Sequence, residues 1–227
     1  MYTLCWSAKG GSGTTVVASA LAVLTARTQP TVVVDLGGDV APALGVGTPT
    51  GPGLAEWWAS PNAPPATLLP LAHEIGPGLG LIHPGDPHTD PVGDLVRHDV
   101  HAERLAAALA CTDGHVVVDA GESVPPPTLH QCADQSLLVV RPCYLALRRA
   151  VRFTGLATGV IVVGEPGRAL GTTEIERSLG LPVVAEIPWD PAVARAIDAG
   201  LLASRLPGSL ARPLTRVVRA GMRGQLT

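Results

Sequence analysis

The chain has 227 residues, of which 46% are hydrophobic and 15% are charged, and its formal net charge is −3 at pH 7. This length suits one domain, and this balance predicts a well-buried core and excludes a disordered protein. The sequence shows no 18-residue apolar segment and no charged-then-apolar leader, so we expect a soluble cytoplasmic protein. The four cysteines lack C-x-x-C spacing and lie in apolar or helix-like segments, which favours free buried thiols over disulfides or zinc ligands.

Residues 2–15 form an apolar run that breaks into glycines and restarts as a helix. Gly10, Gly11 and Gly13 permit tight turns whose backbone N–H groups face an anion, next to the positive end of the helix dipole. Directly before them stands Lys9, the only lysine among 16 basic residues, and a compact ammonium suits phosphate oxygens. The stretch predicts a nucleotide-phosphate site, and the alternative is a strand-to-helix turn whose glycines serve packing only.

The segment K-G-G-S-G-T-T, Lys9 to Thr15, resembles the deviant Walker A motif, K-G-G-x-G-K-[ST], of the ParA/MinD superfamily of P-loop ATPases. The resemblance implies that Lys9 reaches the phosphates of a partner subunit in a nucleotide-sandwich dimer, while Thr15 holds Mg²⁺. It also implies that phosphate is cradled by the backbone amides of Gly10, Gly11, Ser12, Gly13 and Thr14.

Thr14 departs from the family pattern, because a second lysine stands at this position in the motif. A charge-assisted hydrogen bond contributes about 1.5–3 kcal/mol, so its loss would weaken phosphate binding roughly tenfold to a hundredfold unless another group compensates. The TadZ/CpaE pilus-assembly branch of the family resembles this chain in tolerating that loss.

Seven short apolar runs predict strands that are covered on both faces. They are residues 2–6, 31–35, 79–82, 115–119, 136–140, 159–163 and 182–187. Segments with helical spacing lie between most of them, at residues 15–27, 94–111, 144–157, 172–179 and 191–199. The alternation predicts one α/β domain over residues 1–227, with a doubly wound, mostly parallel sheet of about seven strands and helices on both faces. The resemblance implies the same P-loop NTPase fold, whose ligands lie beyond the carboxyl ends of the strands.

Two of these strands end in acids that the resemblance assigns to magnesium and catalysis, together with Lys9. Asp35, in D-L-G-G-D, resembles the first switch I aspartate, and Asp119, followed by A-G-E, resembles the Walker B aspartate. Gly37 stands where the family has a second acid that orients the attacking water, so we expect slow or absent hydrolysis. The alternative is that Asp35 only terminates its strand and that Asp39 is a helix N-cap.

Two later segments of this chain resemble the segments that bind the nucleotide base in this family. Residues 159–163 resemble the strand that ends in an adenine-reading asparagine, but Gly164 stands at that place. The segment L-G-L-P-V-V-A-E-I-P-W-D-P, residues 179–191, is similar to the family's L-G-h-P-V-h-x-x-I-P-x-D and assigns the base-side loop to Pro188, Trp189 and Asp190. Trp189 either stacks on a purine or is a packed loop residue. The implied ligands are ATP and Mg²⁺.

Residues 42–91 hold eleven of the 22 prolines and predict connecting, lid-like material with helices at residues 54–59 and near 66–73. Trp57 and Trp58 are adjacent on the first of these helices, so we expect that they do not both face one core and that one is exposed at an interface or half-exposed.

The histidines and aspartates of residues 83–101 predict a solvated loop with capping acids. The alternative is a metal site on one helical face, formed by Asp94, His98 and His101.

A basic helix is expected at about residues 208–224, because residues 205–227 contain five arginines and no acid. Arg212, Arg216, Arg219 and Arg223 share one face of it. This face is either the outer surface of a closing helix, a non-specific contact to DNA phosphates, or a contact to an anionic membrane or an acidic partner.

The resemblance covers nearly the whole chain and implies a nucleotide-dependent homodimer switch that positions cargo such as DNA, a septum or a pilus machine. Thr14, Gly37 and Gly164 favour a second hypothesis, a pseudo-ATPase scaffold that hydrolyses little or nothing. A third is a non-specific DNA-binding module that acts through the arginine face. We therefore expect at most a degenerate ATPase, cytoplasmic or peripheral on nucleoid or membrane, with an unidentified protein partner.

Overall fold

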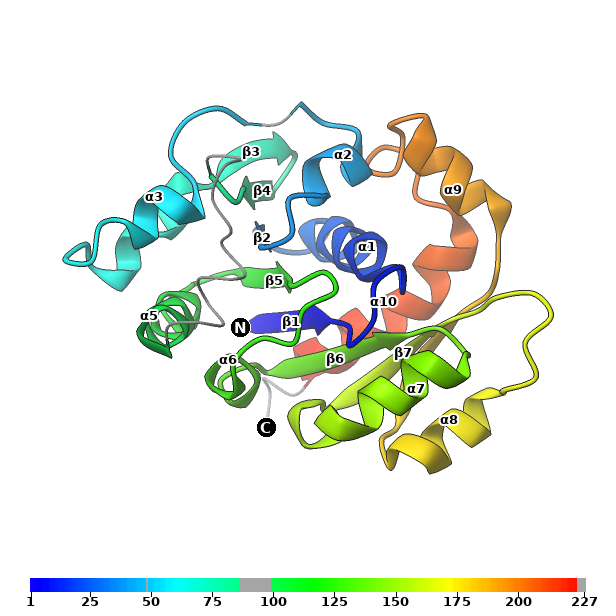
Figure 1. The fold of residues 1–227 in the computed structure, drawn as a ribbon. Helices are drawn as coiled ribbons and strands as arrows, with labels where there is room; N and C mark the ends of the chain where they lie inside the picture. Colours follow the sequence, from blue (N-terminus) through cyan, green and yellow to red (C-terminus); the bar gives the residue numbers. More distant parts are fainter. Residues whose placement is uncertain (48, 86–98, 224–227) are drawn as a thin grey trace.

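The structure is a computed structural model that describes residues 1–47, 49–85 and 99–223. Its centre is an eight-stranded sheet with the order β3-β4-β2-β5-β1-β6-β7-β8 (Figure 1). The strands are β1 (Tyr2–Trp6), β2 (Thr31–Asp35), β3 (His73–Gly76), β4 (Leu79–Ile82), β5 (His115–Asp119), β6 (Gln135–Val140), β7 (Gly159–Val163) and β8 (Val183–Ile187). All neighbours are parallel except β3 and β4, which are antiparallel.

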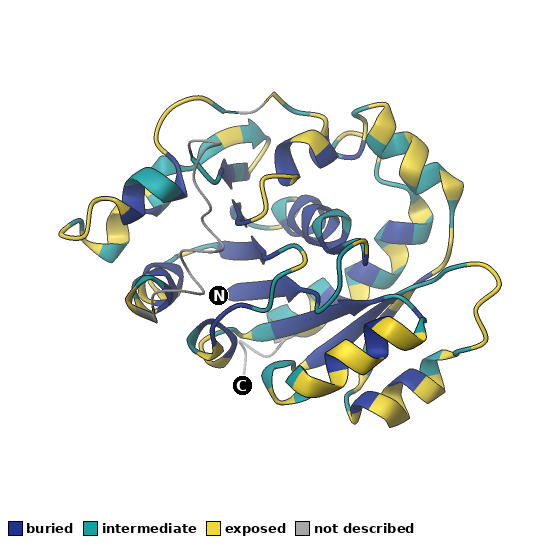
Figure 2. Ribbon diagram, viewed as in Figure 1, coloured by how far each residue is buried: buried dark blue, intermediate teal, exposed yellow. Residues whose placement is uncertain are grey.

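The inner strands are buried on both faces, as their continuous apolar sequences predict (Figure 2). Every residue of β1 and of β5 is buried. β1 lies at the centre, between β5 and β6. The strands β2 to β5 lie on one side of it, and the later strands β6 to β8 lie on the other. The carboxyl end of β1 therefore lies where the winding of the sheet changes direction, the usual ligand position in open α/β sheets.

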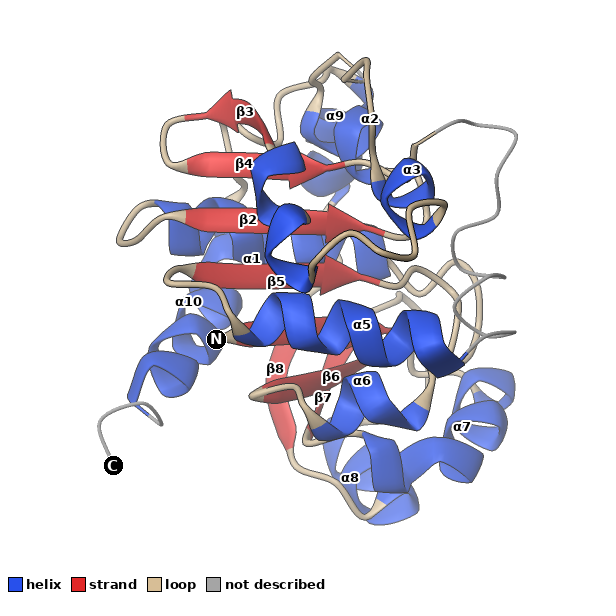
Figure 3. Cartoon of the chain, turned by 90° about the vertical axis from the view of Figure 1, so that its left-hand side faces the viewer, coloured by secondary structure: helices blue, strands red, loops and turns tan. Residues whose placement is uncertain are grey.

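Helices cover both faces of the sheet (Figure 3). One face carries α1 (Thr14–Ala26), α2 (Val40–Leu44), α9 (Pro191–Asp198) and α10 (Gly208–Arg223). The other carries α3 (Leu54–Trp58), α5 (Asp99–Ala110), α6 (Pro127–Gln131), α7 (Tyr144–Ala150) and α8 (Thr172–Leu179). The predicted doubly wound, mostly parallel architecture is confirmed.

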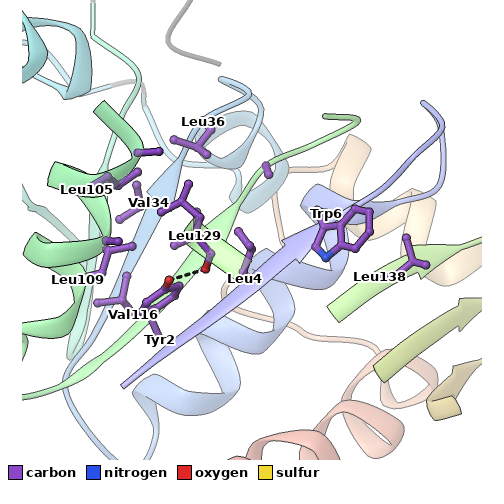
Figure 4. Close-up of a cluster of buried hydrophobic side chains, with 14 of the residues drawn as sticks. Tyr2, Leu4, Trp6, Val34, Leu36, Leu105, Leu109, Val116, Leu129 and Leu138 are labelled. Carbon is purple, nitrogen blue, oxygen red and sulfur yellow. Dashed lines mark hydrogen bonds between the residues drawn. The ribbon is translucent and has the colours of Figure 1, made fainter. Parts of the chain in front are cut away.

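Each face of the sheet has its own apolar core. Figure 4 shows part of the second, where Leu105 and Leu109 of α5 lie near Tyr2 and Leu4 of β1. The Tyr2 hydroxyl donates to the backbone oxygen of Leu129 in α6, so the only polar atom of this ring is satisfied inside the core.

The sequence did not predict the eighth strand, β3, which forms an antiparallel hairpin with β4 at the sheet edge. The helix expected near residues 66–73 is instead two short 3₁₀ helices, η1 (Pro65–Thr67) and η2 (Leu69–Leu71), followed by β3. Proline at the start of each one explains the difference, because Pro70 lacks a backbone N–H and its ring clashes with the preceding turn of a continuous helix. The helix expected at residues 144–157 ends at Ala150 and continues as a 3₁₀ helix, η3 (Val151–Leu156).

The expectation that Trp57 and Trp58 do not share a core is wrong, because both are buried with 4% exposure. The guanidinium of Arg104 lies 3.9 Å from the ring centroid of Trp57, whose Nε1 donates to the Thr67 hydroxyl. The edge of the Trp58 ring meets His101 of α5. The one-turn α3 is covered from several sides at once, so neighbouring positions on it are both enclosed.

Asp94 and His98 of the alternative metal site lie outside the described residues. Within the described ranges, no group of three or more histidine, cysteine, aspartate or glutamate side chains is placed to hold a metal ion. All four cysteines are free thiols, but the expectation that they are buried holds only for Cys5, since Cys111 and Cys132 are exposed and Cys143 is half-buried. In the same part of the chain, every helix is too short or too polar to cross a membrane.

Candidate nucleotide-phosphate site

The loop between β1 and α1 is held in shape by its own serines. The Ser12 hydroxyl donates to the Lys9 carbonyl oxygen at 2.7 Å, and the Ser7 hydroxyl donates to Ser12 Oγ at 2.8 Å. Gly11 and Gly13 have φ angles of +74° and +90°, which other residues rarely adopt. The loop is thus preformed, with the first turn of α1 directly behind it, as an anion cradle requires.

Lys9 is partly buried, and its Nζ donates to the carbonyl oxygen of Gly10 in its own loop at 3.2 Å. Glu122, which follows β5, covers Gly10 so closely that a methyl group at this position would collide with the Glu122 carboxylate. Because the clashing atom is the free end of an exposed side chain, a larger residue at position 10 requires only that Glu122 turns away. The sequence offered only the A-G-E tripeptide as a signal for this acid.

The two acids predicted at strand ends lie side by side. Asp35 of β2 and Asp119 of β5 are register partners across parallel strands, and both are buried. Burial, followed by the neighbouring charge of Asp35, raises the pKa of Asp119 to about 7, while a hydrogen bond with the Thr15 side chain lowers it. The structure therefore brings Thr15, Asp35 and Asp119 together beside the loop.

The carboxylates of Asp35 and Asp119 differ in how many hydrogen bonds their oxygens accept. Asp35 Oδ1 accepts from the amides of Gly37 and Gly38, and Asp35 Oδ2 accepts from the amide of Val40 at 2.9 Å. Asp35 therefore shapes the loop after β2 and caps α2. Asp39, the N-cap in the alternative interpretation, makes no side-chain cap bond.

Asp119 is different because one of its oxygens has no hydrogen-bond partner. Oδ1 accepts from the Gly121 amide at 3.0 Å, whereas Oδ2 is buried without a partner. A buried carboxylate oxygen is costly unless it is paired or bound to a metal. Since the Thr15 side chain interacts with the same carboxylate, Asp119 and Thr15 together fit Mg²⁺, which is usually held by one or two carboxylates together with substrate phosphates and water.

Gly37 and Gly164, which stand where the family has functional side chains, differ in the space around them. A Cβ at Gly37 would lie 3.9 Å from Asp35 Oδ1 and 4.0 Å from the Gly121 Cα, so a side chain fits there. A Cβ at Gly164 would lie 3.0 Å from the Ile187 carbonyl oxygen, because the backbone after β8 packs on this glycine. An asparagine at position 164 is excluded unless that backbone shifts.

An apolar pocket of about 220 Å³ lies between the loop and the segment after β8, where the resemblance places the base. Gly13, Val16, Gly164, Pro188 and Trp189 are among its lining residues. The Trp189 side chain is 54% exposed, so it is not a packed loop residue, and its ring is available to a planar ligand.

Asp190, assigned to the same base-side loop, also lines this pocket but has both carboxylate oxygens in use. It caps α9 through the Ala192 amide at 2.8 Å and accepts from the Ser209 hydroxyl at 2.6 Å. The hydrogen bond with Ser209, and to a smaller extent that with the Ala192 amide, lowers the pKa of Asp190. Its role in the structure is to join α9 to the start of α10.

The arginines of α10 lie far along the chain from this loop. Arg212, Arg216 and Arg219 are exposed, while Leu210, Leu214 and Val217 are buried in the core that contains α1. The side chain of Arg223 lies outside the described residues. α10 is thus a closing helix with a basic outer face, and that face is free to meet an anionic surface.

No family model and no curated protein matches the sequence. Solved structures do match it over almost its full length. A ParA family ATPase from Chlorobium tepidum TLS superposes with a TM-score of 0.79 at 21% identity, covering 96% of this chain and 97% of that one. For MinD from Aquifex aeolicus the TM-score is 0.76 at 17% identity, with 98% and 96% covered. For McdA from Cyanothece in complex with ATP the TM-score is 0.77 at 18% identity, with 98% and 96% covered.

The chain has the ParA/MinD fold. This confirms the fold that the Lys9–Thr15 motif implied, because structures of that fold superpose on almost the whole chain. The particular likeness to the TadZ/CpaE branch stays a prediction.

Proposed function

We propose that this chain is a nucleotide-dependent dimer switch of the ParA/MinD type, which binds ATP with Mg²⁺ and positions a cellular cargo with weak or absent hydrolysis. The observation that carries the proposal is the buried pair Asp35 and Asp119 beside a preformed glycine loop, with Asp119 Oδ2 lacking any partner. Two adjacent buried carboxylates and an unpaired oxygen are costly in an empty site and are offset when a cation binds.

Most of the predicted residues have a role in this proposal. The amides of residues 10–14 hold the phosphates, and the Thr15 hydroxyl and Asp119 hold Mg²⁺, which supplies charge neutralisation to the phosphate chain. Asp35 fixes the loop that carries Gly37, through the three amide bonds described above. The apolar pocket with Trp189 on its wall receives the base. The solved relatives support this ligand class, since one is an ATP complex and another, a putative plasmid partition protein from Borrelia burgdorferi, is bound to AMPPNP.

Gly37 supports the weak-hydrolysis part of the proposal, because no carboxylate stands where an attacking water would be oriented. The pseudo-ATPase scaffold differs from the switch only in turnover and in its need for nucleotide. The partner is an anionic surface, DNA or membrane, that meets the exposed arginines of α10. We therefore propose a cytoplasmic protein that becomes peripheral on nucleoid or membrane.

Restoring the missing acid should restore turnover. Gly37→Asp places a carboxylate where there is room for one, and positioned acid–base groups contribute about 10²–10⁴-fold to a rate. We expect kcat for ATP to rise at least about tenfold in this variant, measured as phosphate release at saturating ATP and Mg²⁺. Gly37→Asn is the matched control, since it adds similar bulk without the charge. Equal turnover in both variants and in the unchanged protein would show that the missing acid does not limit hydrolysis.

The proposed function is tested by calorimetric titration of Mg²⁺-supplemented protein with ATP, ADP and GTP, with the oligomeric mass followed in the same samples. Tight ATP binding together with dimer formation supports the switch. A constitutive dimer that is indifferent to all three nucleotides supports the scaffold and rejects the switch.

A further inference from the structure

Arg141 lies at the nucleotide site although no motif assigned it there. It follows β6 directly, and β6 is the neighbour of β1 in the sheet (Figure 1). In the β1–β6 register Trp6 pairs with Leu138. Lys9 is three residues beyond Trp6, and Arg141 is three residues beyond Leu138. Both cations therefore leave neighbouring parallel strands at the same edge of the sheet.

Arg141 also lies close to the phosphate loop itself. It lines the apolar pocket together with Gly13, the residue before the first turn of α1. On the other side of β6, Val140 pairs with Val162, so Arg141 is next to Val163. Val163 in turn lies within 3.8 Å of the position that a Cβ on Gly13 would take. Gly13 immediately precedes Thr14, the position at which the second lysine of the motif is missing.

The guanidinium of Arg141 has no anionic partner among residues 1–47, 49–85 and 99–223. Its Nε is buried without a hydrogen-bond partner, and between described residues the one ion pair is Arg168 with Glu165. The pKa of Glu165 is lowered first by its hydrogen bond to Arg168, with smaller contributions from the charges of Arg168, Arg141 and Lys9. Arg141 and Lys9 thus contribute to one region of positive potential at the loop. A buried guanidinium N–H without a partner is unfavourable unless an anion accepts its hydrogen bond.

We infer that Arg141 replaces the missing cis lysine, and that its guanidinium binds the phosphate chain of the nucleotide held by its own subunit. This inference rests on the proposed function. A planar guanidinium approaching from β6 bonds phosphate oxygens through two N–H groups, whereas the family's lysine approaches from α1 as a point charge. The chain therefore keeps two cations at the site, Lys9 and Arg141, although the motif has lost one.

The test is a double-mutant cycle in nucleotide binding. The proteins are the unchanged chain, Arg141→Met, Thr14→Lys and the double variant, with Arg148→Met on the exposed face of α7 as the control. Dissociation constants for Mg²⁺-ATP and Mg²⁺-ADP are measured by calorimetry. We expect Arg141→Met to weaken both about 10- to 100-fold, and Arg141→Lys to weaken them less than about fivefold. In the Thr14→Lys background we expect Arg141→Met to cost less than about threefold, because one lysine already supplies the charge.

Thermal unfolding of each apo variant separates loss of binding from loss of fold. Arg141→Gln, which keeps a polar side chain without the charge, should weaken binding as Arg141→Met does and keeps the test valid if Arg141→Met unfolds. Nucleotide affinity unchanged in Arg141→Met, or a loss equal to that of Arg148→Met, overturns the inference and leaves the proposed function standing. Loss of dimer mass without loss of affinity also overturns it, because Arg141 would then contact a second copy. If the unchanged protein binds neither nucleotide, the proposed function fails together with the inference.

Discussion

Replacing Asp119 by asparagine should abolish Mg²⁺-dependent ATP binding and at the same time raise the free energy of unfolding of the apo protein. Asp119 Oδ2 is the buried oxygen without a partner, and the neighbouring Asp35 carboxylate is also buried. The asparagine removes one of two adjacent negative charges, which stabilises the empty fold. The same change removes the charge that holds the cation. The two effects have opposite signs, so a variant that merely misfolds cannot imitate them.

The stability effect should depend on pH in a defined direction. Burial and Asp35 raise the pKa of Asp119 from its ordinary value of 3.8 to about 7. The folded protein therefore holds a proton that the unfolded chain has already lost, and stability falls as pH rises from about 4 through about 7. Above pH 7 Asp119→Asn should be more stable than the unchanged protein by about 2–4 kcal/mol, with little difference near pH 4.

Denaturant unfolding between pH 4 and pH 8.5 measures this difference, and titration with Mg²⁺-ATP measures the binding loss. Asp113→Asn is the control, because Asp113 is an exposed acid shortly before β5. Unchanged Mg²⁺-ATP affinity in Asp119→Asn would remove Asp119 from the metal site.

Replacing Lys9 by methionine should abolish ATP-driven dimer formation while ATP binding by the monomer stays within about threefold of the unchanged protein. Among the residues that the structure describes, Lys9 Nζ donates only to the carbonyl oxygen of its own Gly10, and the loop is held by Ser7 and Ser12 instead. The cradle for phosphate therefore does not depend on the Lys9 side chain. A symmetric dimer makes the trans contact twice. At about 1.5–3 kcal/mol for each, the loss weakens the dimer roughly 10²- to 10⁴-fold.

Sedimentation or light scattering with Mg²⁺-ATP, Mg²⁺-ADP and no nucleotide gives the dimer population. Arg148→Met serves as the matched loss of one exposed cation. A Lys9→Met protein that still dimerises with ATP would contradict the trans contact, and one that loses monomer affinity as well would place Lys9 at the phosphates of its own subunit.

The strands and the phosphate loop were predictable because both depend on local chemistry. Unbroken runs such as H-V-V-V-D favour strands covered on both faces, and β5 has all five residues buried. The glycines at positions 11 and 13 predict positive φ angles, which the structure shows. β3 was missed because H-E-I-G carries little strand signal, and only pairing with β4 makes it one.

The sequence by itself determined an α/β sheet, a glycine loop with one lysine, and three departures from the nucleotide-binding pattern. Only the tertiary structure decided that Asp35 and Asp119 are adjacent with one oxygen unpaired, that Gly37 has room for a Cβ while Gly164 is tightly packed against the backbone after β8, and that Arg141 lies beside the loop. The physical reason is the distance along the chain over which each determinant acts. Backbone dihedrals and apolar periodicity act over a few residues, whereas the charge and space around a side chain are set by strands that are distant in sequence and adjacent in the sheet.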